Sequence, residues 1–194
     1  VNRHLSQSFF KFNNPPPKIV HAKALALKFT AVTLSMCKDN DKQIVLSDQY
    51  PNVTLVLGMT GSGKSTFVQW IAGNDSKLIA KNDGLDEFTI EDNNERIGEG
   101  TVSKTVIPEL VVDNRTDQAY YDCPGFSDTR NSTMDIAGTY FIKKVADYAQ
   151  SVKLLFVVGF NSVRRGGDRI DILKLFRHAT GLVRDVDKFR LSIA

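Results

Sequence analysis

The stretch Val53-Thr54-Leu55-Val56-Leu57-Gly58-Met59-Thr60-Gly61-Ser62-Gly63-Lys64-Ser65 decides the fold of this chain. Its first five residues form a compact apolar run, rich in β-branched side chains, that predicts a buried strand. A glycine-rich turn follows, and the segment Lys64–Ala72, closed by Gly73, predicts a helix. Strands that alternate with helices in this way are typical of an α/β domain in which helices cover a mostly parallel sheet.

The turn itself matches the pattern G-x-x-x-x-G-K-[ST] at every fixed position. Glycines allow the backbone to curl so that several N–H groups point at phosphate oxygens, and the following helix adds its positive N-terminal end. Lys64 is expected to reach the β- and γ-phosphates, and the Ser65 hydroxyl is expected to bind Mg²⁺. The predicted nucleotide-binding residues of this loop are Gly58, Thr60, Gly61, Ser62, Gly63, Lys64, Ser65 and Thr66.

A second motif, Asp122-Cys123-Pro124-Gly125, ends the short predicted strand Ala119–Asp122. A pattern D-x-x-G alone indicates no more than a turn after a strand. Here it follows the phosphate-binding loop by the length of one crossover and one further strand, which favours a functional role. We therefore predict that Asp122 and Ser65 hold Mg²⁺ and that the backbone N–H of Gly125 binds a γ-phosphate.

The composition is that of an ordinary globular protein. The chain has 194 residues, of which 42% are hydrophobic and 24% charged, and this length suits one sizeable domain. The net charge of +3 is too small, with acidic residues interspersed, to indicate nucleic-acid binding. Cys37 and Cys123 have no disulfide-framework spacing, so we expect reduced thiols in an intracellular, cytoplasmic protein. No apolar run reaches the roughly 18–20 residues that cross a bilayer, and membrane association stays open.

The remaining pattern divides the chain into an N-terminal arm with a short strand or helix (1–49) and the phosphate-loop domain (50–194). Apolar residues in Ala22–Cys37 alternate at first, which favours a strand, although the same residues also fit a helix, and Gln43–Ser47 is a second strand candidate. Residues 74–100 are polar and predict a long loop. Further predicted elements are an extended segment at Val102–Val112, a helix at Asp135–Ser151, a buried strand at Leu154–Phe160, a helix at Arg169–Thr180 ended by Gly181, and the first part of a strand at Phe189–Ala194.

The two motifs together suggest a family. G-M-T-G-S-G-K-S-T at 58–66 and D-C-P-G-F-S-D-T at 122–129 resemble the GTPases of the septin and immunity-associated (GIMAP-type) branch of the TRAFAC class. The resemblance covers roughly residues 50–194. It implies a Ras-like P-loop NTPase fold, a three-layer sandwich with a mostly parallel sheet. It also implies GTP or GDP with Mg²⁺ as ligands, and nucleotide-dependent homodimers or filaments.

The resemblance also implies a switch residue that closes over Mg²⁺. The stretch Thr101-Val102-Ser103-Lys104-Thr105 is similar to the corresponding stretch of GIMAP-type proteins, and that alignment selects Ser103, with Thr101 and Thr105 as close alternatives. Where Ras-like proteins carry a water-positioning Gln after D-x-x-G, this chain has Phe126. An apolar side chain cannot orient water, which implies slow intrinsic hydrolysis or catalytic groups from a partner. No catalytic residue is therefore assigned.

The base-reading box N/T-K-x-D of GTPases follows no suitable strand here. Leu191–Ala194 resembles the start of the strand that precedes it, so we expect this sequence to be a piece of a longer protein, incomplete at its C-terminus. Three hypotheses follow: a slow GTPase that acts as a switch or assembly module, a nucleotide-binding scaffold without turnover, and a P-loop ATPase. Trp70, on the first helix, is expected in the core.

Overall fold

The central feature of the fold is a mixed, mostly parallel sheet. The computed structural model describes residues 17–74, 78–82, 84, 88–92, 105–126, 132–164 and 169–182. The sheet has the order β4-β5-β1-β6, with β1 parallel to both β5 and β6 and β4 antiparallel to β5. The strands are β1 (Asn52–Leu57), β4 (Glu109–Asp113), β5 (Gln118–Asp122) and β6 (Ser151–Phe156). The predicted α/β class and the mostly parallel sheet are confirmed.

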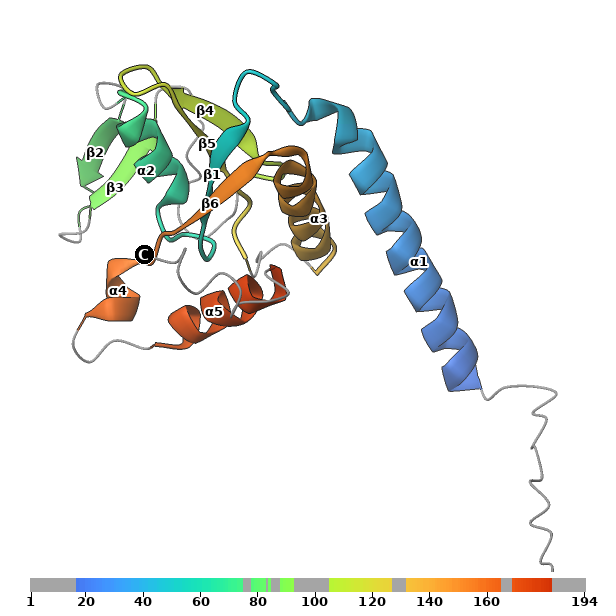
Figure 1. The fold of residues 1–194 in the computed structure, drawn as a ribbon. Helices are drawn as coiled ribbons and strands as arrows, with labels where there is room; N and C mark the ends of the chain where they lie inside the picture. The colour runs from blue at the N-terminus through green and yellow to red at the C-terminus, as the bar shows by residue number, and fades with distance from the viewer. Residues whose placement is uncertain are drawn as a thin grey trace, which may run out of the picture.

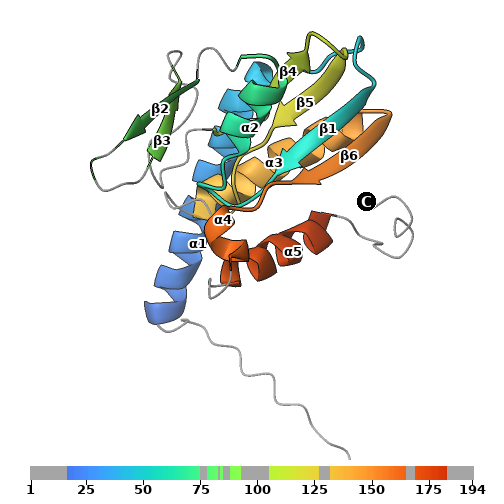
Figure 2. The ribbon, with the colours of Figure 1, turned by 90° about the vertical axis from the view of Figure 1, so that its left-hand side faces the viewer.

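Helices pack on both faces of this sheet, as Figures 1 and 2 show. On one face Val53, Leu55 and Leu57 of β1 pack against α3 (Ser132–Tyr148). On the other face Val56 packs against Val68 of α2 (Lys64–Ile71). Because side chains alternate along a strand, β1 is buried from both sides, as its apolar run predicts. Two further helices follow β6, α4 (Phe160–Val163) and α5 (Ile170–Leu182).

The segment Ala22–Cys37 is helical, so the favoured strand is wrong. It lies within α1 (Pro17–Asn40), which runs alongside α3 and extends beyond the body of the domain (Figure 1). Its composition suits a helix, since Ala, Leu and Lys are strong helix formers and no Gly or Pro interrupts it. Leu25 and Leu27 are both exposed, so their alternation marks no buried face. Met36 and Cys37, near the C-terminal end of α1, pack against the core.

The second strand candidate, Gln43–Ser47, is also wrong. Residues Asp41–Gln43 form a short 3-10 helix, η1, and the chain then runs without regular structure to β1. This segment is held by side-chain contacts and not by backbone hydrogen bonds to any of the described strands. Ile44 is buried in the core, and the Tyr121 hydroxyl donates a hydrogen bond of 2.6 Å to the carbonyl of Val45.

A β-hairpin occupies part of the predicted loop at 74–100, which is a further correction. Strands β2 (Leu78–Asn82) and β3 (Phe88–Asp92) pair antiparallel in a sheet of their own. The turn residues carry a recognisable signal, because the Asn82 side chain accepts a hydrogen bond from the Gly84 amide at 2.8 Å and Gly84 has φ 88°. Because the segment is largely polar, this turn pattern alone did not predict strands on either side of it.

Other elements shift modestly against expectation. The strand predicted at Leu154–Phe160 is β6, three residues earlier, and Leu154 is 36% exposed rather than buried. Gly181 lies inside α5 and does not end it. Trp70 is 60% exposed, because its neighbours Val68 and Gln69 occupy the buried side of α2. Residues 189–194 lie outside the described ranges.

Candidate functional site

The glycine-rich loop joins the end of β1 to the start of α2. Gly61 and Gly63 adopt φ of 78° and 89°, a left-handed conformation that glycine adopts without strain. The first hydrogen bond of α2 runs from the Phe67 amide to the Gly63 carbonyl at 2.9 Å, and the Gly63 cap position offers no side-chain acceptor. The amides of Lys64, Ser65 and Thr66 therefore need acceptors from outside the helix, and a helix N-terminus of this kind suits an anion.

Lys64 is buried beneath this loop, with 6% of its surface exposed. Its ammonium group donates hydrogen bonds to the carbonyls of Gly58 at 3.2 Å and Met59 at 3.0 Å. Burial lowers the pKa of Lys64, while the charge of nearby Asp122 raises it. The loop thus places a positive charge next to a helix N-terminus, and both attract the negative charge of a phosphate chain.

Asp122 ends β5 beside this cation, and 5% of its surface is exposed. Its carboxyl group accepts hydrogen bonds from the hydroxyls of Ser65 and Thr105. Burial raises the pKa of Asp122 to about 6, although these bonds and the Lys64 charge act in the opposite direction. Within the described part of the chain, Oδ1 is buried and has no hydrogen-bond partner. An orphaned carboxylate oxygen next to a serine hydroxyl fits a hard divalent cation.

Among the candidate switch residues, Thr105 lies in the described part of the chain, and its hydroxyl bonds to Asp122. The register explains this contact, because Glu109 at the start of β4 pairs with Asp122 at the end of β5. The segment that enters β4 therefore passes the carboxyl group. Ser103 and Thr101 lie outside the described residues.

The turn after β5 lies directly on the glycine-rich loop. The Phe126 amide donates to the Gly58 carbonyl at 3.1 Å, and the Thr60 amide donates to the Phe126 carbonyl at 3.2 Å. A Cβ atom on Gly125 would lie 2.6–2.8 Å from atoms of Thr60. Glycine is thus required at this position by the close approach of the two motifs.

Two side chains of this turn point into the protein. Cys123 has no exposed surface, and burial raises the pKa of its thiol, so the thiol is not activated as a nucleophile. Phe126 is 4% exposed, and its ring stacks on that of His178 in α5 with centroids 4.7 Å apart and planes 1° apart. The sequence gives no local signal for this pair, which depends on how α5 packs.

A metal at this site would rely on a small protein ligand set. In the described ranges, no three His, Cys, Asp or Glu side chains gather as a metal cluster. Mg²⁺ in phosphate sites commonly uses one or two carboxylates and completes its shell with water and phosphate oxygens. Ser65 and Asp122, with Thr105 beside them, match that pattern.

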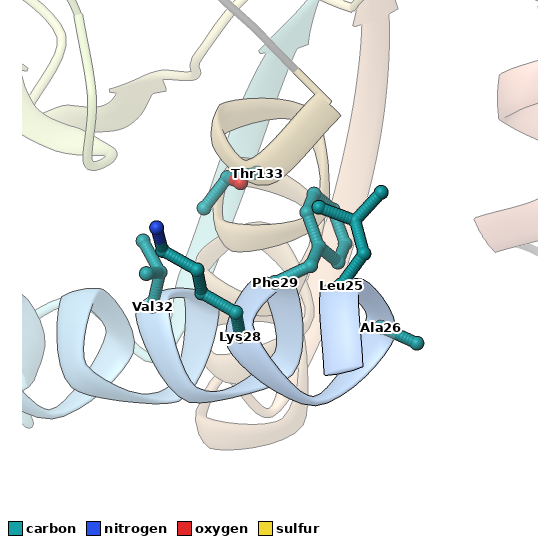
Figure 3. Close-up of a pocket in the computed structure, with 6 residues that line it drawn as sticks. All are labelled: Leu25, Ala26, Lys28, Phe29, Val32 and Thr133. Carbon is teal, nitrogen blue, oxygen red and sulfur yellow. The ribbon is translucent and has the colours of Figure 1, made fainter. Parts of the chain in front are cut away.

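An apolar groove of about 610 Å³ lies between α1 and the first turn of α3. In Figure 3, Leu25, Phe29 and Val32 rise from α1 towards Thr133. The groove contains none of the phosphate-loop residues.

Among the described helices, none is long and apolar enough to span a membrane. Comparisons with protein-family models, with curated proteins and with solved structures gave no match to this chain.

Proposed function

We propose that this chain is a Mg²⁺-dependent GTP-binding domain of Ras-like P-loop type, which hydrolyses GTP slowly and acts as a nucleotide-controlled switch or assembly module. The observation that carries the proposal is the orphaned, buried Oδ1 of Asp122, set next to Ser65 and Lys64 at the start of α2. A buried carboxylate oxygen without a hydrogen-bond partner is costly, and a cation that binds it removes that cost.

Lys64 would bind the β- and γ-phosphates, and the backbone amides of the first turn of α2 would bind phosphate oxygens beside it. Mg²⁺, held by Ser65 and Asp122, would neutralise negative charge on the β- and γ-phosphate oxygens. Ser103 stays the switch residue that the resemblance selects, and Thr105 joins it as a candidate because its hydroxyl bonds to Asp122. Gly125 is the residue of the second motif that offers a backbone N–H towards the γ-phosphate.

Slow turnover follows from Phe126. Its ring is buried against His178, so it offers no polar group to a water molecule at the phosphate. The same observation supports the alternative of a nucleotide-binding scaffold without turnover. The choice of guanine over adenine rests on the resemblance of the two motifs to septin- and GIMAP-type GTPases, as does the proposal of nucleotide-dependent homodimers or filaments.

The test is nucleotide binding by the full chain, with fluorescent GDP, GTPγS and ATPγS in Mg²⁺ or in EDTA. We expect binding that requires Mg²⁺, prefers guanine and is lost in Lys64→Ala. Lys143→Ala is the matched control, because Lys143 lies on the exposed surface of α3 in an ion pair with Asp147. A preference for ATPγS would favour the ATPase. Binding of neither nucleotide would overturn the proposal.

Phosphate release distinguishes the two guanine-binding alternatives. A slow release of phosphate from GTP that disappears in Lys64→Ala supports the GTPase. Tight binding of GTP without any release supports the scaffold.

A further inference from the structure

We propose that His178 is a positioning residue: its ring holds Phe126, and through Phe126 the neighbouring Gly125, against the glycine-rich loop. The proposal concerns α5, a helix that contributes none of the residues assigned to phosphate or metal. It deepens the proposed function by giving the loop after β5 a fixed support outside the nucleotide site.

The support is rigid because His178 lies on the buried side of α5. Leu175, three residues before it, is buried and belongs to the same core cluster as Phe126. Residues at this spacing share one face of a helix. The imidazole therefore approaches Phe126 from a helix whose preceding turn is packed in the core.

Phe126 transmits this support to the phosphate loop through its backbone. Its amide and its carbonyl both bond to that loop, at Gly58 and at Thr60. The ring of the same residue is stacked parallel to the ring of His178. One residue thus connects α5 to the glycine-rich loop, and removal of the stack takes away the contact with α5 while the backbone hydrogen bonds to the loop remain.

The consequence for ligands depends on the proposed function. Gly125 immediately precedes Phe126, and its amide is the group assigned to the γ-phosphate. GDP lacks that phosphate. A looser turn must be ordered before Gly125 can bind the γ-phosphate, so loss of the stack should weaken triphosphate binding while GDP binding is little changed.

The first experiment needs no nucleotide. Amide hydrogen exchange of Thr60 and Phe126 is measured in the full chain as wild type, His178→Ala, His178→Phe and Arg177→Ala. We expect exchange roughly three- to tenfold faster in His178→Ala, the effect of a lost aromatic stack. His178→Phe keeps a flat ring and Arg177→Ala changes an exposed neighbour on α5, so both should match wild type.

If His178→Ala does not fold, His178→Leu replaces it, because leucine fills the volume without a flat ring. Exchange at wild-type rates in the Ala or Leu variant would overturn the proposal. Equal acceleration in the Phe variant would do so as well, since it would show that stacking is not what holds the turn.

The second experiment compares fluorescent GTPγS with GDP on the same variants. We expect His178→Ala to weaken GTPγS binding roughly three- to tenfold, with GDP affinity nearly unchanged. An equal loss for both nucleotides would reduce His178 to a structural role and contradict the proposal. If wild type binds neither nucleotide, the proposed function fails, and the exchange rates alone decide whether His178 positions the turn.

Discussion

The backbone amide of Thr60 donates a hydrogen bond of 3.2 Å to the carbonyl of Phe126, so the glycine-rich loop and the turn after β5 form one unit. The two segments are far apart in the sequence, yet neither can move at this point without the other. A substitution in the turn should therefore also affect the phosphate loop.

Gly125→Ala tests this connection. The added methyl group would lie 2.6–2.8 Å from atoms of Thr60, so the turn must move away from the loop. We expect a loss of roughly 1–3 kcal/mol in the free energy of unfolding, and a loss of the preference for GTPγS over GDP. Urea denaturation measures the first and nucleotide titration the second.

Gly181→Ala is the matched control. A Cβ atom on Gly181 meets nothing within 4 Å, and the residue lies inside α5. Alanine should therefore stabilise the protein by roughly 0.5–1 kcal/mol. Wild-type stability and nucleotide preference in Gly125→Ala would show that the contact with Thr60 is dispensable.

Asp122→Asn should stabilise the nucleotide-free protein at neutral pH. The pKa of Asp122 rises from 3.8 to about 6 on folding, so its ionised form opposes the fold. That cost is absent below pH 3.8, grows as the pH rises and is complete above about 6, where it reaches at most roughly 3 kcal/mol. The same variant should lose Mg²⁺-dependent nucleotide binding.

Thermal unfolding of Asp122→Asn and wild type between pH 3.5 and 8 measures this difference. The stability gain of the variant should shrink as the pH falls towards 4. Asp147→Asn, an exposed carboxylate on α3, should change stability by less than about 0.5 kcal/mol at any pH. A variant less stable than wild type at pH 7.5 would contradict the assignment of a costly buried charge.

Thr105→Ala compares the switch candidates. The Thr105 hydroxyl lowers the pKa of Asp122, so its removal should raise that pKa further. It should also weaken Mg²⁺-dependent GTPγS binding by about tenfold, the cost of a lost hydrogen bond to a charged group. Titration of GTPγS at several Mg²⁺ concentrations measures this effect, with Ser103→Ala measured in parallel. A larger effect in Ser103→Ala would support the alignment-based choice.

Tyr121→Phe should destabilise the domain. Its hydroxyl donates to the Val45 carbonyl at 2.6 Å and thereby ties the segment after η1 to β5. We expect a loss of about 1 kcal/mol in the free energy of unfolding. Tyr120→Phe, on the opposite face of the same strand, should cost less than half of that. Equal stability of Tyr121→Phe and wild type would show that the packing of Ile44 alone holds this segment.

The phosphate loop could be predicted from the sequence because its geometry is local. Val53–Leu57, the glycines and Lys64–Ala72 are contiguous, and each part needs only its neighbours to adopt its conformation. The placement of Asp122 at a strand end follows in the same way. Spacing alone therefore predicted which residues gather at the end of β1.

Features that depend on tertiary packing were not predictable in this way. The alternation of apolar residues at Leu25 and Leu27 favoured a strand. Both side chains are exposed on α1, so the alternation does not correspond to a buried face. Thr105 reaches Asp122 because of a strand register, and Phe126 meets His178 because of a helix position. Neither contact corresponds to a sequence pattern with a fixed spacing.

Because Cys123 is buried next to the site, its reactivity reports how often the site opens. A thiol reagent reaches Cys123 only when the core around the end of β5 opens, so the rate of alkylation measures how often that opening occurs. Cys37 on α1 retains exposed surface and provides an internal reference for reagent activity. A bound ligand that joins the two motifs would slow labelling at Cys123 and leave Cys37 unaffected.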